Sequence, residues 1–277
     1  MESNVKFIET SQGYKLQITD IGKGRPILFI PGWPLAHEIF KFQLQFLAEN
    51  GYRAIGITLR GFGYSDKPDT NYNFEEFAQD IHAVIVDLKL EDVVLCGFSM
   101  GGFIAAYYMA KYLPQNVSKL LLFSCNAPCT TIQENYPFGI SKNAFDDLIT
   151  LISQDPVLIT DIYGPLFQLD EKIMARTMGN WINKISGQAS KRAMINSMIA
   201  TRDMDLRNLL PKISVPTVVF HATNDNVIPY EIAQQAQKLI PNSSLITFEN
   251  GGHWIFLLEK EKFNSVLLSF ISVKEKV

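Results

Sequence analysis

The fold of this chain is decided by the stretch Val93-Val94-Leu95-Cys96-Gly97-Phe98-Ser99-Met100-Gly101-Gly102. Its apolar start is typical of a buried strand, and a helical pattern runs from Met100 until Pro114 ends it. Ser99 therefore stands at a strand-to-helix turn, in the pattern Gly-x-Ser-x-Gly. Gly97 and Gly101 have no Cβ atom, so neighbouring backbone can pass closely there. We expect the Ser99 hydroxyl to project above the edge of a sheet, where it could act as a nucleophile.

A helix that begins at Met100 would direct its unpaired N–H groups at the reaction site. Acyl transfer through a serine needs two backbone N–H donors aimed at the developing oxyanion. Met100 supplies one by its position, and the loop of residues 30–34 would supply the second through the N–H of Trp33, since Pro34 cannot donate. The alternative interpretation is that Ser99 only caps a helix, which would explain the serine but not its partners.

Strand and helix patterns alternate on both sides of this turn. Continuous apolar runs separated by helical periodicity predict an α/β protein with a parallel sheet covered on both faces. Asn73, followed by Glu76, predicts a helix N-cap with a reciprocal partner. Strands are expected at residues 14–19, 26–30, 53–59, 93–98, 119–125, 216–222 and 244–248. Helices are expected at residues 39–48, 74–88, 100–113 and 230–240, with a last amphipathic helix around 263–270.

The alternation stops between Asn126 and Leu210. This stretch has several helical patterns, including residues 145–152 and 173–185. We interpret residues 126–210 as a helical cap inserted into a core of residues 1–125 and 211–277. Methionines are concentrated in the cap, at Met174, Met178, Met194, Met198 and Met204. They either line an adaptable apolar pocket or pack the core of the cap itself, and both interpretations stay open.

His253 and Asp225 are the candidates for the base and the acid that a serine nucleophile needs. His253 follows the glycine-rich stretch 250–252, between the last strand and the last helix, and Asp225 follows the strand before it. Both side chains would reach the carboxyl edge of the sheet beside Ser99. The simpler alternatives are a surface histidine and an ordinary turn aspartate.

The other three histidines are weaker candidates. His37 lies just beyond the loop at Gly32, where it could line the pocket. His82 lies among the apolar positions of a helix and is interpreted as half-buried. His221 lies inside an apolar strand, where we expect a core histidine with satisfied hydrogen bonds.

Composition narrows the class of protein. A chain of 277 residues can bury a core that needs neither disulfides nor metals. The net charge is −3 and no run of Lys or Arg exceeds two residues, which disfavours nucleic-acid binding. No apolar run reaches 18 residues, so no membrane span is expected, and residues 1–9 do not resemble a secretory signal. Three cysteines (Cys96, Cys125 and Cys129) cannot all pair, and reduced thiols suit a cytoplasmic setting. A homo-oligomer is left open.

These motifs together resemble a known family over nearly the whole chain. The sequence resembles the α/β-hydrolase superfamily, and within it the cofactor-free haloperoxidase and arylesterase-like branch. The order Ser99, Asp225, His253 is the order found in that superfamily, and it differs from chymotrypsin and subtilisin. The matching pieces are Pro31-Gly32-Trp33-Pro34-Leu35, Arg60-Gly61-Phe62-Gly63-Tyr64-Ser65, Gly97-Phe98-Ser99-Met100-Gly101-Gly102, Thr223-Asn224-Asp225-Asn226-Val227-Ile228-Pro229 and Gly251-Gly252-His253.

The resemblance implies a mostly parallel, eight-stranded sheet flanked by helices, with a helical cap. It implies an enzyme that forms an acyl-serine intermediate from carboxylic esters and needs no haem or metal cofactor. It also implies a perhydrolase or haloperoxidase side activity, in which hydrogen peroxide replaces water. Two departures are Pro31, where the family usually has His, and Ala222 in place of a Gly. Related epoxide hydrolases and haloalkane dehalogenases have Asp at the nucleophile, so Ser99 argues against both.

Small to medium apolar esters are the expected substrates. Two alternatives use the same machinery differently. One is other hydrolase chemistry, by a lactonase, a thioesterase or a C–C hydrolase. The other is a receptor of the same fold that binds a small molecule without catalysis.

Overall fold

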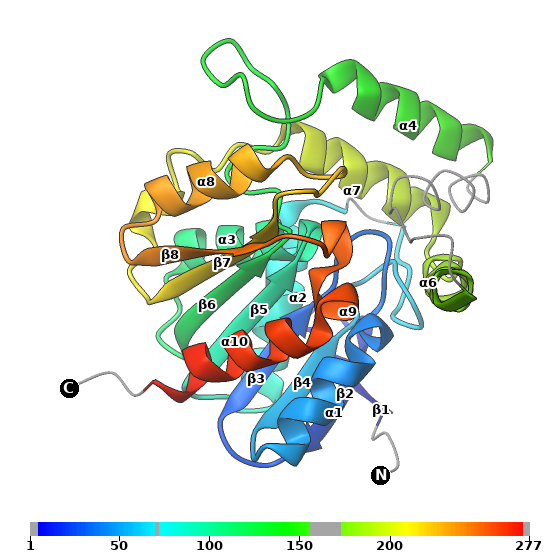
Figure 1. Cartoon of the computed structure of the whole chain (residues 1–277). Helices are drawn as coiled ribbons and strands as arrows, with labels where there is room; N and C mark the ends of the chain where they lie inside the picture. Colours follow the sequence, from blue (N-terminus) through cyan, green and yellow to red (C-terminus); the bar gives the residue numbers. More distant parts are fainter. Residues whose placement is uncertain (1–4, 70–71, 156–172, 274–277) are drawn as a thin grey trace.

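The computed structural model describes residues 5–69, 72–155 and 173–273 of the chain. Within these ranges the strands form one sheet of eight in the order β1-β2-β4-β3-β5-β6-β7-β8 (Figure 1). The strands are β1 (Val5–Glu9), β2 (Lys15–Gly22), β3 (Pro26–Ile30), β4 (Arg53–Ile57), β5 (Val93–Phe98), β6 (Val117–Phe123), β7 (Thr217–Ala222) and β8 (Ser243–Phe248). The α-helices are α1 (Lys41–Glu49), α2 (Phe74–Asp87), α3 (Met100–Tyr112), α4 (Lys142–Gln154), α6 (Ile173–Ser186), α7 (Lys191–Asp203), α8 (Tyr230–Leu239), α9 (Ile255–Leu258) and α10 (Lys260–Ser272). Short 3₁₀ helices are η1 (His37–Phe40), η2 (Leu210–Lys212) and η3 (Gly252–Trp254).

The sheet is mostly parallel, as predicted from the alternation of strands and helices. Only β1 with β2 and β2 with β4 pair antiparallel, and the other neighbours pair parallel. The sequence analysis did not anticipate β1. Among its residues only Ile8 is buried, so this edge strand carries no alternating apolar pattern that could reveal it.

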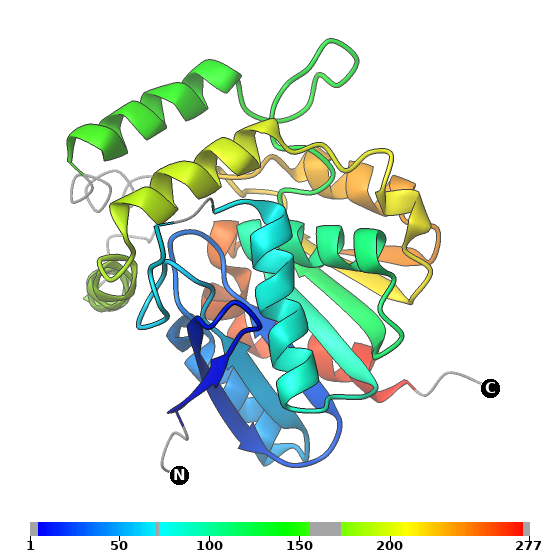
Figure 2. The same ribbon diagram turned by 180° about the vertical axis from the view of Figure 1, so that it is seen from behind.

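Helices cover both faces of the sheet (Figure 1 and Figure 2). On one face, α1, α9 and α10 bury side chains such as Leu47 and Phe263. On the other, α2, α3 and α8 bury side chains such as Ile81, Phe103 and Ala233. Both faces of the central strands are therefore dry, which explains why those strands are continuous apolar runs in the sequence.

The bounds of the central elements follow from burial. Residues 26–30 and 93–98 are strands with the predicted bounds, because every residue in them is buried. The predicted strand 119–125 lies two residues earlier, as β6. It ends at Phe123 because Ser124 has a φ of 45°, which leaves the extended conformation. The N-cap of α2 forms as predicted, with Asn73 Oδ1 accepting a hydrogen bond from Glu76 N–H at 3.0 Å.

Helices α4, α6 and α7 lie in sequence between β6 and β7, where the helical segment was predicted. In Figure 1, α4 and α7 lie across the carboxyl ends of the strands. The start of α7 is attached to the loop after β4, since Ser190 N–H donates to Gly61 O at 2.8 Å. A Cβ atom at Gly61 would lie 2.4 Å from Ala193 Cβ, so only glycine allows this approach. The division into a core and a cap of residues 126–210 stays a prediction, and residues 156–172 of that cap lie outside the described ranges.

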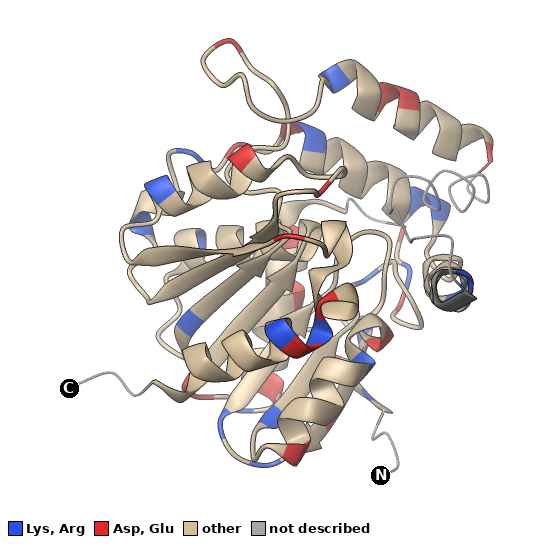
Figure 3. Cartoon of the chain, viewed as in Figure 1, with Lys and Arg blue, Asp and Glu red and all other residues tan. Residues whose placement is uncertain are grey.

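Charges of both signs occur on the helices beside the sheet and on those above its edge (Figure 3). Within the described ranges, no helix combines the length and the apolar character that crossing a membrane requires.

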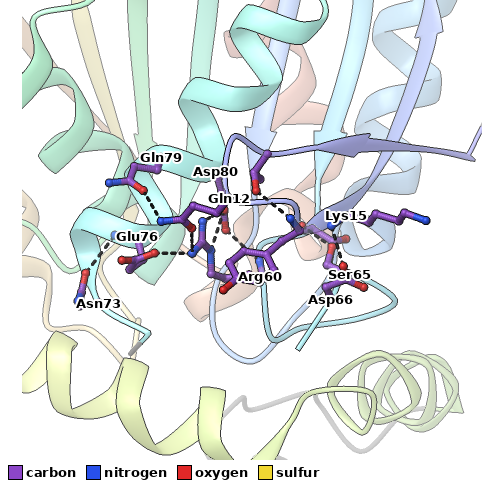
Figure 4. A network of polar contacts seen from close by, with 12 residues as sticks. Gln12, Lys15, Arg60, Ser65, Asp66, Asn73, Glu76, Gln79 and Asp80 are labelled. Atoms are coloured by element: carbon purple, nitrogen blue, oxygen red, sulfur yellow. Dashed lines mark hydrogen bonds and ion pairs between the residues drawn. The ribbon is translucent and has the colours of Figure 1, made fainter. Parts of the chain in front are cut away.

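Arg60 and Asp80 form an ion pair from which solvent is fully excluded (Figure 4). The Arg60 guanidinium donates to Asp80 Oδ1 from Nε at 2.9 Å and from NH2 at 2.7 Å, and Arg60 N–H donates to Asp80 Oδ2 at 3.0 Å. The guanidinium also donates to Gln12 and to Glu76. The Glu76 carboxylate was predicted to return a hydrogen bond to the N-cap of α2, but it pairs with Arg60 instead. This network fixes the loop after β4 against α2, and the same loop holds α7.

Burial raises the pKa of the Asp80 carboxyl to about 6, while the hydrogen bonds and the charge of Arg60 act in the opposite direction. Replacing Arg60 with Leu leaves this carboxylate buried without its cation. We expect the free energy of unfolding to fall by about 3–5 kcal/mol at about pH 7.5, measured by denaturant unfolding. Because the pKa of Asp80 in the folded chain lies above the ordinary value of 3.8, the folded protein binds this proton more tightly, and the contribution of Asp80 to stability becomes more favourable as pH falls from about 6 towards 3.8.

Arg60 lowers the pKa of Asp80, so without Arg60 this carboxyl takes up a proton more readily and its buried charge is removed at about pH 5. The loss of unfolding free energy in Arg60→Leu should therefore be smaller at about pH 5 than at about pH 7.5. The matched control is Arg192→Leu, because Arg192 pairs with Asp69 on the surface and should lose less than about 1 kcal/mol. Equal losses for the two variants, or a loss at Arg60 that does not change with pH, would contradict this account.

Candidate active site

Ser99 lies at the turn between β5 and α3 in a strained backbone conformation. Its φ is 52° and its ψ is −123°, values that a residue with a side chain rarely adopts. Ser99 N–H donates to Phe123 O at 3.0 Å, which ties the turn to the end of β6. A Cβ atom at Gly97 would lie 2.4 Å from Gly102 Cα, and one at Gly101 would lie 2.3 Å from Pro31 O. The backbone therefore passes as closely as the sequence predicted.

His253 and Asp225 are joined by a buried hydrogen bond at the same edge of the sheet. His253 Nδ1 lies 2.9 Å from Asp225 Oδ2. Because the carboxylate can only accept, Nδ1 carries the proton and Nε2 is left as the basic nitrogen of the neutral ring. Asp225 Oδ1 accepts from Val227 N–H at 2.8 Å and from Ile228 N–H at 2.9 Å. Burial by itself raises the pKa of Asp225, but His253, with His221 and the N–H of Ile228, lowers it below the ordinary value.

A second pair of contacts joins the loops that carry these two residues. Gly252 N–H, next to His253, donates to Asn224 Oδ1, next to Asp225, at 3.0 Å. On the far side of the glycines, Asn250 N–H donates to Glu259 Oε1 at 3.0 Å. The imidazole ring also packs on Phe98, with ring centroids 4.9 Å apart. These contacts fix the histidine loop at three points.

Ser99 and His253 line one cavity of about 600 Å³. Its walls are mainly apolar, with Trp33, Phe98 and Met100 beside the serine. Helices α4 and α7 contribute Ala144, Phe145, Asp147, Leu148, Leu151, Met198 and Thr201. Among the described residues that line it, none is Lys or Arg. Within the same part of the chain, no group of three or more His, Cys, Asp or Glu side chains could hold a metal ion.

Trp33 and Met100, the predicted oxyanion donors, both border this cavity. Met100 is the first residue of α3, so its N–H has no acceptor within the helix. The loop that carries Trp33 is closed by a hydrogen bond from Leu35 N–H to Gly32 O at 2.9 Å. The Trp33 indole N–H donates to Met194 O of α7 at 3.1 Å, which links this loop to the helices above it.

The methionines predicted to line a pocket or a core do both. Met198 lines the cavity. Met194 is buried in the apolar core. Met178 and Met204 pack against the two core clusters, and the side chain of Met174 lies outside the description. Methionine content therefore did not identify the cavity wall by itself.

Two of the remaining histidines differ from their predicted places. His37 is not among the described lining residues, because its ring lies between two threonine hydroxyls, 2.8 Å from Thr19 Oγ1 and 2.6 Å from Thr58 Oγ1. Burial lowers the pKa of His37, although the charge of Glu38 opposes this. His82 is exposed rather than half-buried, and its ring stacks on Tyr112. His221 is a core histidine, as predicted, and contacts Asp225, but its hydrogen bonds are not all satisfied as expected, because Nδ1 has no partner in the described part of the chain.

Asn126 is a residue of this site that the sequence analysis did not single out. It lies just after β6, is buried, and lines the cavity. Its Oδ1 lies 3.4 Å from Ser99 Oγ, within reach of the hydroxyl. Asn126 could have been identified from its position after a buried strand, because that position lies at the same edge of the sheet as Ser99 and Asp225.

Comparisons with known proteins agree with this architecture. Residues 25–260 match the family model described as alpha/beta hydrolase fold. The chain is 41% identical over 265 residues to the AB hydrolase superfamily protein YisY of Bacillus subtilis (strain 168), covering 95% of this chain and 98% of that protein. It is 30% identical over 271 residues to the non-heme chloroperoxidase CPO-A1 of Kitasatospora aureofaciens, covering 95% and 98%. A solved esterase (EaEST) of Exiguobacterium antarcticum superposes with a TM-score of 0.93 at 40% identity, covering 97% and 99%.

The close approach at Gly101 gives a stability prediction. Gly101→Ala places a methyl group against two backbone oxygens, Pro31 O at 2.3 Å and Ile30 O at 2.4 Å, which cannot move as a side chain could. We expect the free energy of unfolding to fall by about 1–3 kcal/mol, measured by denaturant titration. The control is Gly187→Ala, whose new methyl meets only Asn183 O at 3.2 Å and should change stability by less than about 0.5 kcal/mol. Equal effects of the two substitutions would show that this approach is not tight.

Proposed function

The chain belongs to the α/β-hydrolase family, and we propose that within it the protein is a serine esterase that works through an acyl-serine intermediate. One observation carries the proposal. Ser99, at a strained turn, and His253, hydrogen-bonded to the buried Asp225, border the same apolar cavity. The similarity to a solved esterase supports it.

In the first half-reaction, Ser99 Oγ attacks the ester carbonyl while His253 Nε2 takes the hydroxyl proton. The carbonyl oxygen becomes an oxyanion, and we assign its stabilisation to the N–H groups of Trp33 and Met100. Each such donor contributes about 3–4 kcal/mol to transition-state stabilisation in comparable sites. The tetrahedral intermediate then breaks its bond to the alcohol oxygen, which leaves with the proton from His253. The product of this step is an acyl group on Ser99.

In the second half-reaction, His253 removes a proton from water, and the resulting hydroxide attacks the acyl carbonyl. Collapse of this intermediate returns the proton to Ser99 Oγ and releases the acid. Asp225 keeps the proton of His253 on Nδ1 and stabilises the imidazolium that forms in each half-reaction. Its low pKa keeps it ionised throughout.

The cavity favours neutral, apolar acyl groups. Apart from Asn126 and His253, the lining residues named beside Ser99 are the apolar Trp33, Phe98 and Met100, and the described lining offers no Lys or Arg to a substrate carboxylate. The charged lining residue Asp147, which is exposed, would repel an anionic substrate weakly. Small and medium neutral esters are therefore the proposed substrate class.

Ser99→Ala should abolish turnover of p-nitrophenyl esters, by about 10⁴-fold or more in kcat, because no other group can form the acyl intermediate. The melting temperature should not fall, since Ser99 Oγ makes one long hydrogen bond and its backbone is strained. The measurement is steady-state kinetics on a chain-length series of esters, together with thermal unfolding. Turnover that persists in this variant would refute the assignment of the nucleophile.

A fluorophosphonate probe separates an enzyme from a receptor of the same fold. We expect stoichiometric labelling of the wild-type protein and none of Ser99→Ala, because only an activated serine reacts. Ser269→Ala is the matched control, since Ser269 is an exposed serine on α10 and its loss should leave labelling unchanged. A labelled protein that turns over no ester in the panel would redirect the proposal to lactones, thioesters or C–C bonds, and an unlabelled protein would favour a receptor.

Perhydrolysis is a second candidate activity, favoured by the similarity to a non-heme chloroperoxidase. Acetic acid would acylate Ser99 with release of water. Hydrogen peroxide would then replace water in the second half-reaction, giving peracetic acid and free Ser99, and the peracid would transfer one oxygen to bromide, giving hypobromite and acetic acid. With acetate, peroxide and bromide, we expect bromination of monochlorodimedone by the wild-type protein and none by Ser99→Ala. Equal bromination by both proteins would remove this activity from the proposal.

A further inference from the structure

His221 is a second histidine that lies against the carboxylate of Asp225, besides the cavity-lining His253. It lies in β7, is fully buried, and is not among the described residues that line the cavity. His221 Nε2 lies 2.9 Å from Ile228 O and 3.4 Å from Asp225 Oδ2. The oxygen that faces His221 is the one that accepts the hydrogen bond from His253.

The protonation state of His221 follows from its partners. Ile228 O can only accept a hydrogen bond, so Nε2 of His221 must carry a proton. Nδ1 of the same ring is buried and has no hydrogen-bond partner in the described part of the chain. A proton on Nδ1 would be a buried donor without an acceptor, which is unfavourable. His221 is therefore a neutral ring with its proton on Nε2, and burial lowers its pKa in the same sense, against the charge of Asp225.

This ring closes a loop around the acid. Ile228 N–H donates to Asp225 Oδ1 at 2.9 Å, while Ile228 O accepts from His221. The backbone of Ile228 thus links one oxygen of Asp225 to the histidine that faces the other oxygen. Such a closed arrangement fixes the rotation of the carboxylate as well as its position.

We propose that His221 is a positioning residue for the reaction: its Nε2–H donates to Ile228 O and so fixes the backbone whose N–H binds Asp225 Oδ1, which keeps the carboxylate in the orientation in which Oδ2 holds His253 Nδ1–H. The inference rests on the proposed esterase function, because it assigns His221 a role in that site. The alternative is that His221 only fills space in β7. The two roles differ in what happens when the ring is replaced by a side chain of similar size.

Two substitutions separate these roles. His221→Gln keeps an N–H donor at about the reach of Nε2, whereas His221→Leu fills similar space without a donor. We expect His221→Leu to lower kcat by about tenfold with KM unchanged, as is usual for outer hydrogen-bond partners of a reacting group. His221→Gln should stay close to the wild-type kcat.

The pH–rate profile provides a readout that loss of packing would not move. Without the His221 donor, Ile228 and the carboxylate that it binds are less well fixed, so Asp225 holds His253 Nδ1–H less well and stabilises the imidazolium of His253 less. The acidic limb of kcat/KM, which follows protonation of the base, should therefore move to lower pH in His221→Leu, by on the order of half a unit. The other groups near His221 are Glu231 and Tyr230 of α8, and neither substitution changes them.

A measurement in the resting protein keeps the inference distinct from the esterase proposal. The chain has only 4 histidines, so their ring nitrogens can be assigned by NMR. We expect His221 to be neutral with its proton on Nε2, and we expect the His253 ring to take up its proton only at lower pH in His221→Leu than in wild type or His221→Gln. This test needs no substrate and, for the wild-type tautomer, no folded variant.

The outcomes are then separable. A wild-type protein that hydrolyses no ester, but shows both NMR results, would overturn the esterase and leave the positioning of Asp225 by His221 standing. A proton on Nδ1 of His221 would overturn the inference. So would an acidic limb that stays in place in a folded His221→Leu protein, or a loss of kcat that is equal in the Leu and Gln variants.

Discussion

The backbone at Ser99 must be held in a conformation that costs free energy, on the order of 1–3 kcal/mol, and much of the surrounding architecture serves to hold it. The turn is attached to β6 through Phe123 O, and the start of α3 passes so close to the loop after β3 that Gly101 has no room for a side chain. Because the strain is confined between two buried strands and a buried helix, the serine cannot relax without disturbing the sheet. The same constraint aims the first N–H groups of α3 at the point where Ser99 faces the cavity.

The parallel sheet brings the rest of the candidate site to this point. Strands β5, β6, β7 and β8 end at one edge, and the residues that follow them are Ser99, Asn126, Asp225 and His253. The loop after β4 contributes differently. Its Arg60 is held in a dry network with Asp80, and its Gly61 supports the start of α7, so a buried charge cluster determines where the cavity's upper wall is attached.

The sequence was informative where a local pattern also determined the place of a residue in the fold. A serine, an aspartate and a histidine that each follow a strand could be placed at one edge, because parallel strands share the direction in which they end. β3 and β5 had correct bounds because they are buried on both faces. Contacts between distant segments were not predictable. Proximity to Gly32 in sequence suggested that His37 lines the pocket, but Thr19 and Thr58, from other segments, hold its ring elsewhere. Asn126 was predicted only as the start of the helical stretch 126–210, and helical periodicity could not say which methionine faces the cavity.

The paired contacts between the acid loop and the histidine loop have a consequence for mechanical precision. Two adjacent residues, Asn224 and Asp225, hold two adjacent residues of the other loop, Gly252 and His253, so the loops are coupled in translation and in rotation. When thermal motion shifts β7 relative to β8, the imidazole and the carboxylate therefore move together. The relative position of those two groups is determined by contacts among four residues, so it does not depend on small shifts of the other strands of the sheet. Relative motion is therefore expected mainly between this four-residue unit and Ser99.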